Sequence, residues 1–368
     1  MECLVNRDYL DVVLEGSILR FRCCTTRETQ LYSKLPNNEE SLKQRLFYSF
    51  MSNHTFTIKN MSLQNPSFVP CLRLVKLWLS GNLMSASIPA FIIELCLLAV
   101  YEKYNPLNPV RGFLQFLQFV KEFDWKNDIL ILNSNHSLSD EKIHEIQNEF
   151  ETKKKEGNDG RFIFICTSYD LQSLSTYTLT EPALWNRFIR LASKAYSRIM
   201  ENYMSMNQDG INSIFTASEK EFDVVLRIKD EYLTPTPLTK IMGENQKNRG
   251  IVYMTKEPRN VMFNRSRLLI GYDPELCLYE CIKKIVGNGG VVLMNKEYGN
   301  KLYITWKPSY FIPMKMSMAN VMNGLAVWKE EAEKGSEEKD DMEIIRDVFE
   351  MIAEMKEKMG QVLQSIRF

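Results

Sequence analysis

The stretch GFLQFLQFVKEFDW, residues 112–125, constrains the fold more than any other part of the sequence. Its large apolar residues recur at spacings of three and four, which places them on one face of an α-helix. Glutamines, a lysine and a glutamate interrupt the run, whereas a membrane-spanning helix needs about 20 mostly apolar residues. The stretch therefore predicts a helix that buries one broad face in a protein core, not in a bilayer.

Proline, glycine and asparagine residues divide the neighbouring sequence into further helices. Pro70 and Pro89 stand at the start of two apolar runs with helical spacing, where proline is tolerated because its missing N–H has no partner to lose. Gly81 and the pair Asn105-Pro106 end these runs. We predict a helical domain over residues 39–204. Its buried inner face is expected to include Trp78, Phe113, Phe116, Leu117, Val120 and Trp125.

Alternation of apolar and polar residues predicts β-structure on both sides of this domain. Residues 8–35 alternate around the turn Glu15-Gly16-Ser17, which favours a hairpin within residues 1–38. Residues 205–328 hold several strand candidates, interrupted by a helix at residues 276–286. The strand candidates are residues 222–228, 250–254, 267–273, 289–294 and 301–307. The chain is therefore predicted to be an α+β protein.

The last segment, residues 329–368, is predicted to be an acidic spacer followed by one long helix at residues 341–366. Residues 317–328 also have helical spacing. The apolar seam of the long helix either packs on its own domain or lies in the groove of a partner protein. The acidic spacer is too polar to fold, so it would tether the long helix only loosely. We therefore expect this helix to be a docking element for a partner protein. The seam comprises Ile345, Val348, Ile352, Met355, Met359, Val362 and Ile366.

The charges balance over the whole chain, with 46 Lys and Arg against 46 Asp and Glu. Any surface that attracts nucleic acid must therefore be local. Residues 247–267 interleave cations with Tyr253 and Phe263, a mixture that suits the phosphates and unstacked bases of a structured RNA. A solvated domain surface has a similar composition, so both interpretations stay open. The candidate RNA-binding residues are Lys247, Arg249, Lys256, Arg259, Arg265 and Arg267.

No motif predicts a metal site or a cofactor. The eight cysteines are scattered without a C-x-x-C pair, which is typical of reduced thiols in an intracellular protein. His136 and His144 are eight residues apart, which is not a helical ligand spacing. Cys277 and Cys281 share one helix face, but an apolar face with small members explains them more simply than a metal site.

Three segments in fixed order resemble the Nrap family, the nucleolar RNA-associated proteins. They are PCLRLVKLWLSGNLMSASIPAFIIELCLLAVY, VRGFLQFLQFVKEFDWKNDILIL and FIFICTSYDLQSLSTYT. The residues that keep the family pattern are Arg73, Leu74, Lys76, Trp78, Leu79, Glu94, Leu95, residues 112–116, Asp124 and Trp125. Downstream, FDVVLRIKDEYL, LIGYDPELCLYECI and YITWKPSYFIP resemble the last domain of the family.

The resemblance implies an inactive relative of poly(A) polymerases and oligoadenylate synthetases. Family members are longer, and residues 1–38 are expected to be the tail of a degenerate nucleotidyltransferase-like domain before the helical PAP/OAS1-like domain. Nucleotidyl transfer needs paired carboxylates that hold metal ions. No such pair follows Gly16-Ser17, Asp11 alone is not enough, and Asp170 lacks the surrounding acids of catalytic relatives. We predict no enzyme and no catalytic residue; the alternative is a template-independent nucleotidyltransferase whose catalytic half is supplied elsewhere.

The resemblance also implies a cellular setting. Its members act as scaffolds of the small-subunit processome, in pre-rRNA processing and small ribosomal subunit biogenesis. A nuclear, nucleolar location is therefore expected, with pre-rRNA or small nucleolar RNA, other processome proteins and a processing factor with an RNA-recognition fold as partners. No membrane partner is expected.

Overall fold

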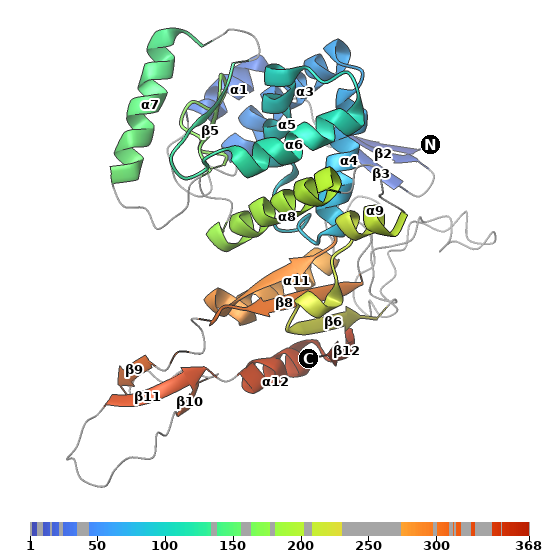
Figure 1. The fold of residues 1–368 in the computed structure, drawn as a ribbon, viewed down its shortest axis with the longest axis vertical. Coiled ribbons are helices and arrows are strands. Elements are labelled where there is room, and N and C mark those ends of the chain that lie inside the picture. Colours follow the sequence, from blue (N-terminus) through green and yellow to red (C-terminus); the bar gives the residue numbers. More distant parts are fainter. Residues whose placement is uncertain are drawn as a thin grey trace. The chain divides into compact units, whose positions relative to one another are not determined.

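The computed structural model describes residues 2–5, 10–14, 17–21, 25–34, 44–133, 138–155, 163–176, 181–201, 208–229, 274–296, 300–308, 312, 314–317, 325–327, 341–346 and 348–367 (Figure 1). The chain divides into two compact units. The helical unit comprises residues 7–9 and 21–217, and the α+β unit comprises residues 1–6, 10–20 and 218–368. These units do not coincide with the four segments predicted from sequence.

The helical unit is built mainly from helices, with one small sheet. Its elements are α1 (Thr26–Ser33), a π-helical turn (Leu46–Phe50), α3 (Met51–Gln64), α4 (Phe68–Gly81), α5 (Ala90–Tyr104), α6 (Pro109–Glu122), β4 (Leu130–Leu132), α7 (Asp140–Lys155), β5 (Ile165–Thr167), α8 (Pro182–Glu201) and α9 (Gln208–Phe215). The helices predicted from the proline, glycine and asparagine signals are confirmed. The first one starts two residues earlier than expected, at Phe68.

Local sequence explains where the central helices begin and end. The side chain of Asn108 accepts a hydrogen bond from the backbone N–H of Val110 at 2.8 Å, and Pro109 occupies the first turn of α6. Asn105 ends α5 in the left-handed conformation at φ 43°, which asparagine tolerates better than most residues. α5 carries ten buried residues and is enclosed by the helices around it.

The core of the helical unit is aromatic. All six residues predicted to form its inner face are buried, so this prediction is confirmed. The rings of Trp78 and Phe113 lie 6.2 Å apart, and Phe188 of α8 packs 5.8 Å from Trp78. Trp125 meets Trp185 edge-on at 4.9 Å and donates its indole N–H to the carbonyl of Val120 at 2.9 Å. The tryptophan thus buries its rings without leaving its polar group unpaired.

Two glycines allow helices to approach more closely than side chains would permit. A Cβ on Gly81 would lie 1.7 Å from the carbonyl oxygen of Phe215 in α9. A Cβ on Gly112 would lie 2.9 Å from the sulfur of Cys71 and 3.0 Å from the Tyr101 hydroxyl. The amide of Ala217 also donates to the carbonyl of Gly81 at 3.0 Å. α9 therefore belongs to the helical unit, although the predicted boundary lay at residue 204.

The two short strands of the helical unit, β4 and β5, form a parallel pair. Their core cluster is completed by α7, through Ile146 and Phe150, together with Phe164 and Cys166. The ring of Phe150 lies 5.3 Å from that of Phe164. A two-stranded parallel sheet is marginal alone, so this packing supports it.

The α+β unit contains a four-stranded antiparallel sheet in the order β12-β6-β8-β7. Its strands are β6 (Val224–Ile228), β7 (Gly290–Met294), β8 (Lys301–Trp306) and β12 (Leu363–Arg367), and its helices are α11 (Pro274–Val286) and α12 (Val348–Met359). In chain order these elements run β-α-β-β-α-β, the split βαβ arrangement. α11 packs against both β7 and α12. The predicted strands at residues 222–228, 289–294 and 301–307 and the helix at 276–286 are confirmed.

Two smaller sheets complete the described part of this unit. β1 (Glu2–Val5), β2 (Leu10–Leu14) and β3 (Ser17–Phe21) form one, in that order. β9 (Met314–Ser317), β10 (Leu325–Val327) and β11 (Asp341–Arg346) form the other, with β11 in the centre. The predicted hairpin is thus part of a three-stranded sheet. The predicted strands at residues 250–254 and 267–273 lie outside the described residues.

Three sequence predictions of secondary structure are wrong. The long helix over residues 341–366 is divided into β11, α12 and β12. Residues 325–327 form a strand where a helix was expected. Residues 26–33 form α1, although the hairpin was predicted to extend to residue 35. The side chains of Thr25 and Glu28 form a capping box at the start of α1, a helix signal that the alternating pattern hid.

Candidate functional site

A partly buried polar network joins three helices of the helical unit. The carboxylate of Glu94 on α5 lies 2.5 Å from the amine of Lys76 on α4 and 2.7 Å from Nε2 of His54 on α3. Nδ1 of His54 lies 3.2 Å from the hydroxyl of Tyr169, which follows β5. The network therefore fixes the loop after β5 to the helical core.

The charges of this network compensate for burial. Burial by itself raises the pKa of Glu94, but the hydrogen bonds from His54 and Lys76 and the positive charge of Lys76 outweigh it, so that the pKa is lowered. A carboxylate only accepts hydrogen bonds, so Nε2 of His54 donates to Glu94. In neutral imidazole, Nδ1 then accepts from the Tyr169 hydroxyl. Burial raises the pKa of Tyr169 above its usual range, so this hydroxyl keeps its proton.

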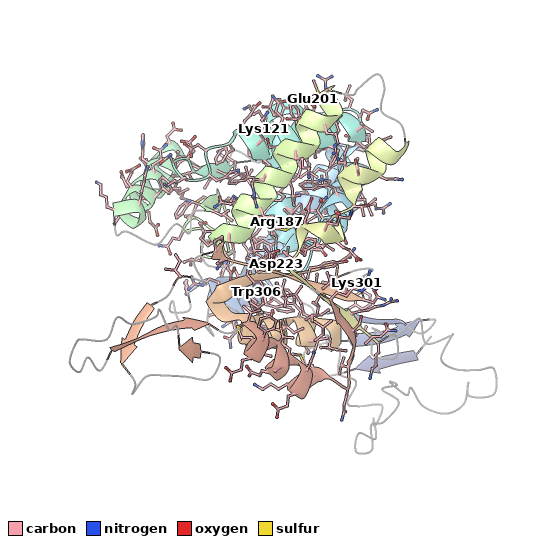
Figure 2. The ribbon with its side chains drawn as sticks, turned by 60° about the horizontal axis from the view of Figure 1, so that its bottom comes forward. Lys121, Arg187, Glu201, Asp223, Lys301 and Trp306 are labelled. Atoms are coloured by element: carbon pink, nitrogen blue, oxygen red, sulfur yellow. The ribbon has the colours of Figure 1, made fainter. Side chains whose placement is uncertain are left out.

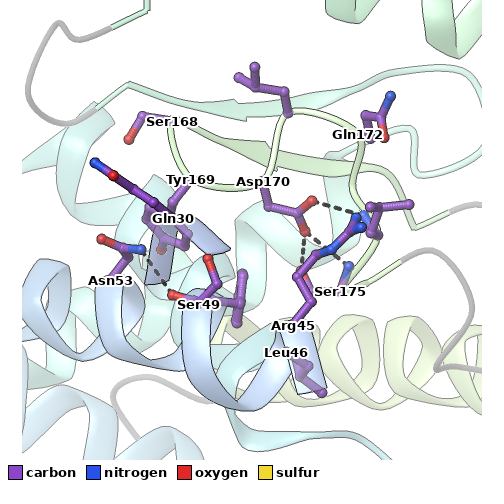
Figure 3. Close-up of a pocket in the computed structure, with 13 residues that line it drawn as sticks. Gln30, Arg45, Leu46, Ser49, Asn53, Ser168, Tyr169, Asp170, Gln172 and Ser175 are labelled. Atoms are coloured by element: carbon purple, nitrogen blue, oxygen red, sulfur yellow. Dashed lines mark hydrogen bonds between the residues drawn. The ribbon is translucent and has the colours of Figure 1, made fainter. Parts of the chain in front are cut away.

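A pocket of about 460 Å³ lies beside the network (Figure 3). Phe50 and Tyr169 belong to its wall, and their rings lie 5.3 Å apart. The remaining lining is largely polar. It comprises Gln30 of α1, Arg45, Leu46, Ser49, Asn53, Ser168, Asp170, Leu171, Gln172, Leu174 and Ser175. The lining thus combines these polar side chains with the apolar surfaces of Phe50, Tyr169 and three leucines.

The carboxylate of Asp170 is engaged by its own loop. It accepts hydrogen bonds from the backbone N–H groups of Leu174 at 2.9 Å and Ser175 at 3.0 Å, and from the Ser175 hydroxyl (Figure 3). Among the described residues that line the pocket, Asp170 is the one carboxylate. The arrangement thus stabilises the loop that follows β5.

The sequence analysis missed His54 and Tyr169 as members of one network. The sequence did contain a signal for this network, because two of its members, Lys76 and Glu94, belong to the family pattern quoted above. Glu94 is also an isolated charge in an apolar helix, and such a charge needs a partner. The contacts of His54 span 40 and 115 residues along the chain, a separation that helical spacing does not reveal.

The candidate RNA-binding residues Lys247, Arg249, Lys256, Arg259, Arg265 and Arg267 lie outside the described residues, as does Gly16. Asp11 lies in β2 opposite Leu4. In the part of the chain that the structure describes, no three His, Cys, Asp or Glu side chains form a group that could hold a metal ion. No helix of that part is long and apolar enough to cross a membrane.

The cysteines differ in their surroundings. Cys71, Cys96 and Cys166 are buried, and burial raises the pKa of the Cys71 thiol to about 11, which makes it a poor nucleophile at neutral pH. Cys277 and Cys281 are exposed on α11, whereas their neighbours Leu278 and Ile282 are buried. The prediction that these two belong to the apolar face of the helix is wrong.

The seven seam residues do not form one helical seam. Ile345 lies in β11 and Ile366 in β12, while Val348, Ile352, Met355 and Met359 lie on α12 and Val362 follows it. Ile352, Met355 and Met359 are buried, and α12 packs against α11. The predicted docking helix is therefore corrected to a structural helix of the α+β unit, since its apolar face is already covered.

The helical unit assigns the protein to a class: a PAP/OAS1-like helical domain joined to an α+β unit. Residues 65–217 match the family model described as Nrap protein PAP/OAS1-like domain 5. The helical unit is thus similar to the domain that this model describes in the Nrap family.

Comparison with curated proteins gives relatives that match most of this chain. Nucleolar protein 6 of Xenopus tropicalis is 25% identical over 338 residues, which cover 87% of this chain and 29% of the relative. Human nucleolar protein 6 is 22% identical, with 85% of this chain and 28% of the relative covered. U3 small nucleolar RNA-associated protein 22 of Schizosaccharomyces pombe is 24% identical, with 61% and 21% covered. The chain thus spans less than a third of the length of these relatives.

Proposed function

We propose that this protein is a nucleolar component of ribosome biogenesis that acts in pre-rRNA processing, as a non-enzymatic scaffold of the small-subunit processome. The observation that carries the proposal is the similarity to nucleolar protein 6 and to U3 small nucleolar RNA-associated protein 22, which extends over both structural units. The printed names of these relatives connect them with the nucleolus and with a small nucleolar RNA. The partners are pre-rRNA or U3-type RNA, other processome proteins and a processing factor with an RNA-recognition fold.

The chemistry of the helical unit supports a scaffold rather than an enzyme. Glu94, His54 and Lys76 are engaged with one another, and Asp170 is engaged with its own loop. These contacts engage each polar group within the fold. The catalytic alternative, a nucleotidyltransferase completed by another chain, would need carboxylates from that chain.

The location and the assembly are tested with the full chain expressed with a tag in its own cells. The expected result is nucleolar signal, co-purification of pre-rRNA or U3-type RNA, and accumulation of unprocessed small-subunit precursors on depletion. A uniform cytoplasmic signal with no associated RNA would contradict the proposal.

The non-enzymatic part of the proposal has its own test. Purified protein is incubated with labelled nucleoside triphosphates, a divalent metal ion and an RNA primer, with and without the co-purified partners. We expect no incorporation. Metal-dependent incorporation that Asp11→Ala abolishes would establish the catalytic alternative, and the scaffold assignment would then be withdrawn.

The basic segment at residues 247–267 remains a candidate contact for RNA. Charge reversal of Arg259, Arg265 and Arg267 is expected to weaken binding to unrelated RNA sequences alike, because cations that contact phosphates release counterions without reading bases. Binding is measured over a series of salt concentrations. An unchanged affinity together with an unchanged salt dependence would identify the segment as an ordinary solvated surface.

A further inference from the structure

The connection between α5 and α6 presents apolar side chains to solvent. Leu107 is 90% exposed, Val110 is 60% exposed and Tyr104 is 39% exposed. Single exposed apolar residues are normal on a protein surface, whereas three of them within one short connection form a local patch. The α5–α6 patch consists of these three residues.

Hydrogen bonds hold the backbone of the patch in a fixed conformation. Asn105 ends α5 in the left-handed conformation, and the side chain of Asn108 accepts a hydrogen bond from the N–H of Val110 at 2.8 Å. Between them, the carbonyl of the buried Pro106 accepts the hydroxyl of Ser67 at 2.5 Å. A partner therefore meets a preorganised surface, and binding does not require the connection to be ordered first.

The turn between α3 and α4 extends the apolar surface beside the patch. Leu63 in the last turn of α3 is 72% exposed, and Pro66 and Pro70 are also exposed. The hydrogen bond from Ser67 to Pro106 holds this turn against the connection between α5 and α6. Two segments that are 39 residues apart in the sequence thus build one apolar end of the helical unit.

The charges around the patch are mainly positive. Lys103 and Arg111 are exposed on either side of it. Residues 41–93, which include α3 and α4, and residues 103–121 contain no aspartate or glutamate, and Glu102 is the acid next to the patch. The patch therefore has an apolar centre with a cationic rim, and an anionic partner complements it.

We propose that the α5–α6 patch docks an acidic, amphipathic segment of a partner protein. Apolar side chains of this segment cover Leu107 and Val110, and its carboxylates face Lys103 and Arg111. Such a division into an apolar centre and a polar rim is common in protein interfaces. The inference deepens the proposed scaffold function, on which it rests for the presence of partner proteins.

Two other occupants fit the patch less well. A second copy of this chain would bring the same cations to a two-fold interface, where they repel one another. RNA bases stack on aromatic or guanidinium planes, whereas Leu107 and Val110 are aliphatic. The ring of Tyr104 already contacts the ammonium of Lys103, which lies 5.0 Å from the ring centre.

The test replaces Leu107 by a photo-crosslinking amino acid in the tagged full chain, expressed in its own cells. Because Leu107 is almost fully exposed, the replacement leaves the core intact. Crosslinked peptides are sequenced by mass spectrometry. The expected result is one partner protein, crosslinked through a segment that interleaves leucine, isoleucine or valine with aspartate and glutamate.

Met200 provides a matched control position for the crosslinker. It is an exposed apolar residue of the same unit and precedes Glu201, which is labelled together with Lys121 in Figure 2. The ammonium of Lys121 lies 5.1 Å from the ring centre of Tyr196 on α8. This end of α8 therefore lies beside the C-terminal end of α6, about 17 Å along that helix from Val110. The crosslinked partner should be absent at position 200.

Paired variants then test the apolar centre. Leu107→Asp/Val110→Asp is compared with Met200→Asp/Ile211→Asp, which adds two carboxylates at exposed apolar positions elsewhere in the unit. The crosslinked segment is made as a fluorescent peptide, and its affinity is measured by anisotropy. The first variant should bind it at least about tenfold more weakly, as loss of an interface anchor does, and the second should bind it as the native chain does. Unchanged thermal melting shows that both variants are folded.

The cationic rim is tested with Lys103→Glu/Arg111→Glu. This variant is expected to bind the peptide more weakly and with a smaller dependence on salt, because dissolved ions screen the attraction between opposite charges. An unchanged affinity and an unchanged salt dependence would show that the partner is not recognised by its acidic groups, and the proposed chemistry would be wrong.

Each other outcome of the crosslinking overturns the inference. A crosslink from position 107 to RNA or to a second copy of this chain would assign the patch to that occupant. No crosslink, or the same crosslinks from positions 107 and 200, would show that the patch is no docking site. If nucleolar signal and associated RNA persist in these cases, the proposed function stands without the patch. If the chain is not nucleolar, the proposed function fails, while a crosslinked acidic segment would still support the docking surface.

Discussion

At the scale of single residues, Phe116 tests the aromatic core of the helical unit. Its side chain is fully buried, and its ring lies 6.3 Å from that of Phe188. Phe116→Ala is expected to lower the free energy of unfolding of this unit by about 3–5 kcal/mol, because the truncation removes buried surface and leaves a cavity. The measurement is denaturant titration. Phe56→Ala, at a site 62% exposed on α3, is the matched control and should cost less than about 0.5 kcal/mol.

The ion pair of Glu94 predicts a dependence of stability on pH. Because the pKa of Glu94 in the folded protein is below its usual 4.5, the ionised group stabilises the fold above about pH 4.5 and loses this effect as the pH falls through the folded value. Glu94→Gln should therefore lower the free energy of unfolding by about 1.5–3 kcal/mol near neutral pH. Parallel titrations of both proteins should converge in acid. A difference that does not change with pH would show that the charge of Glu94 is unimportant.

Single residues also show how much of the candidate site could be predicted. Gly112 and Glu94 were named as parts of a sequence pattern, and the structure gives both a physical role. Gly112 leaves space for Cys71 and Tyr101, and Glu94 pairs with Lys76. The contact of Glu94 with His54 was not predicted, because nothing in the local sequence relates two positions on different helices. The pocket is lined by segments that are far apart in the sequence, so it could not be predicted for the same reason.

At the scale of elements, the C-terminal residues are an integral part of the α+β sheet. β12 pairs with β6, with Ile366 opposite Leu226, and α12 buries Met351, Ile352, Met355 and Met359. Deletion of residues 348–368 is therefore expected to expose the edge of β6 and the apolar side of α11. The shortened protein should melt many degrees lower or become insoluble, as judged by circular dichroism. An unchanged melting temperature would restore the interpretation of this segment as a loosely tethered docking helix.

The outcome for this segment shows why helices were easier to predict than strands. In α6, Phe113, Phe116, Leu117 and Val120 recur at helical spacing and are all buried in the same core, so the local pattern is sufficient. Residues 341–366 have the same spacing, yet pairing of β11 with β9 and β10 and of β12 with β6 determines their structure. Such pairing depends on strands distant in sequence. One local signal was available in the sequence, because glycine commonly ends helices and Gly360 follows the last residue of α12. In the structure, a Cβ on Gly360 would lie 2.4 Å from the carbonyl oxygen of Lys356.

At the scale of the whole molecule, the chain consists of two units with separate cores. The aromatic core of the helical unit includes Trp78, Phe116 and Phe188. The core of the α+β unit includes Leu226, Ile304 and Met355. A unit with its own buried core meets the main condition for folding by itself. The match to the family model ends at residue 217, where the division between the units also falls.

This division predicts that the two units unfold in separate transitions. Met355 is fully buried on α12, so Met355→Ala is expected to cost the α+β unit about 2–5 kcal/mol, while Phe116→Ala weakens only the helical unit. Mutations in units that share no partners act independently. In differential scanning calorimetry each variant should therefore lower one of two transitions and leave the other in place. If both variants shift a single common transition, the two units unfold as one cooperative body and the division into independent units is wrong.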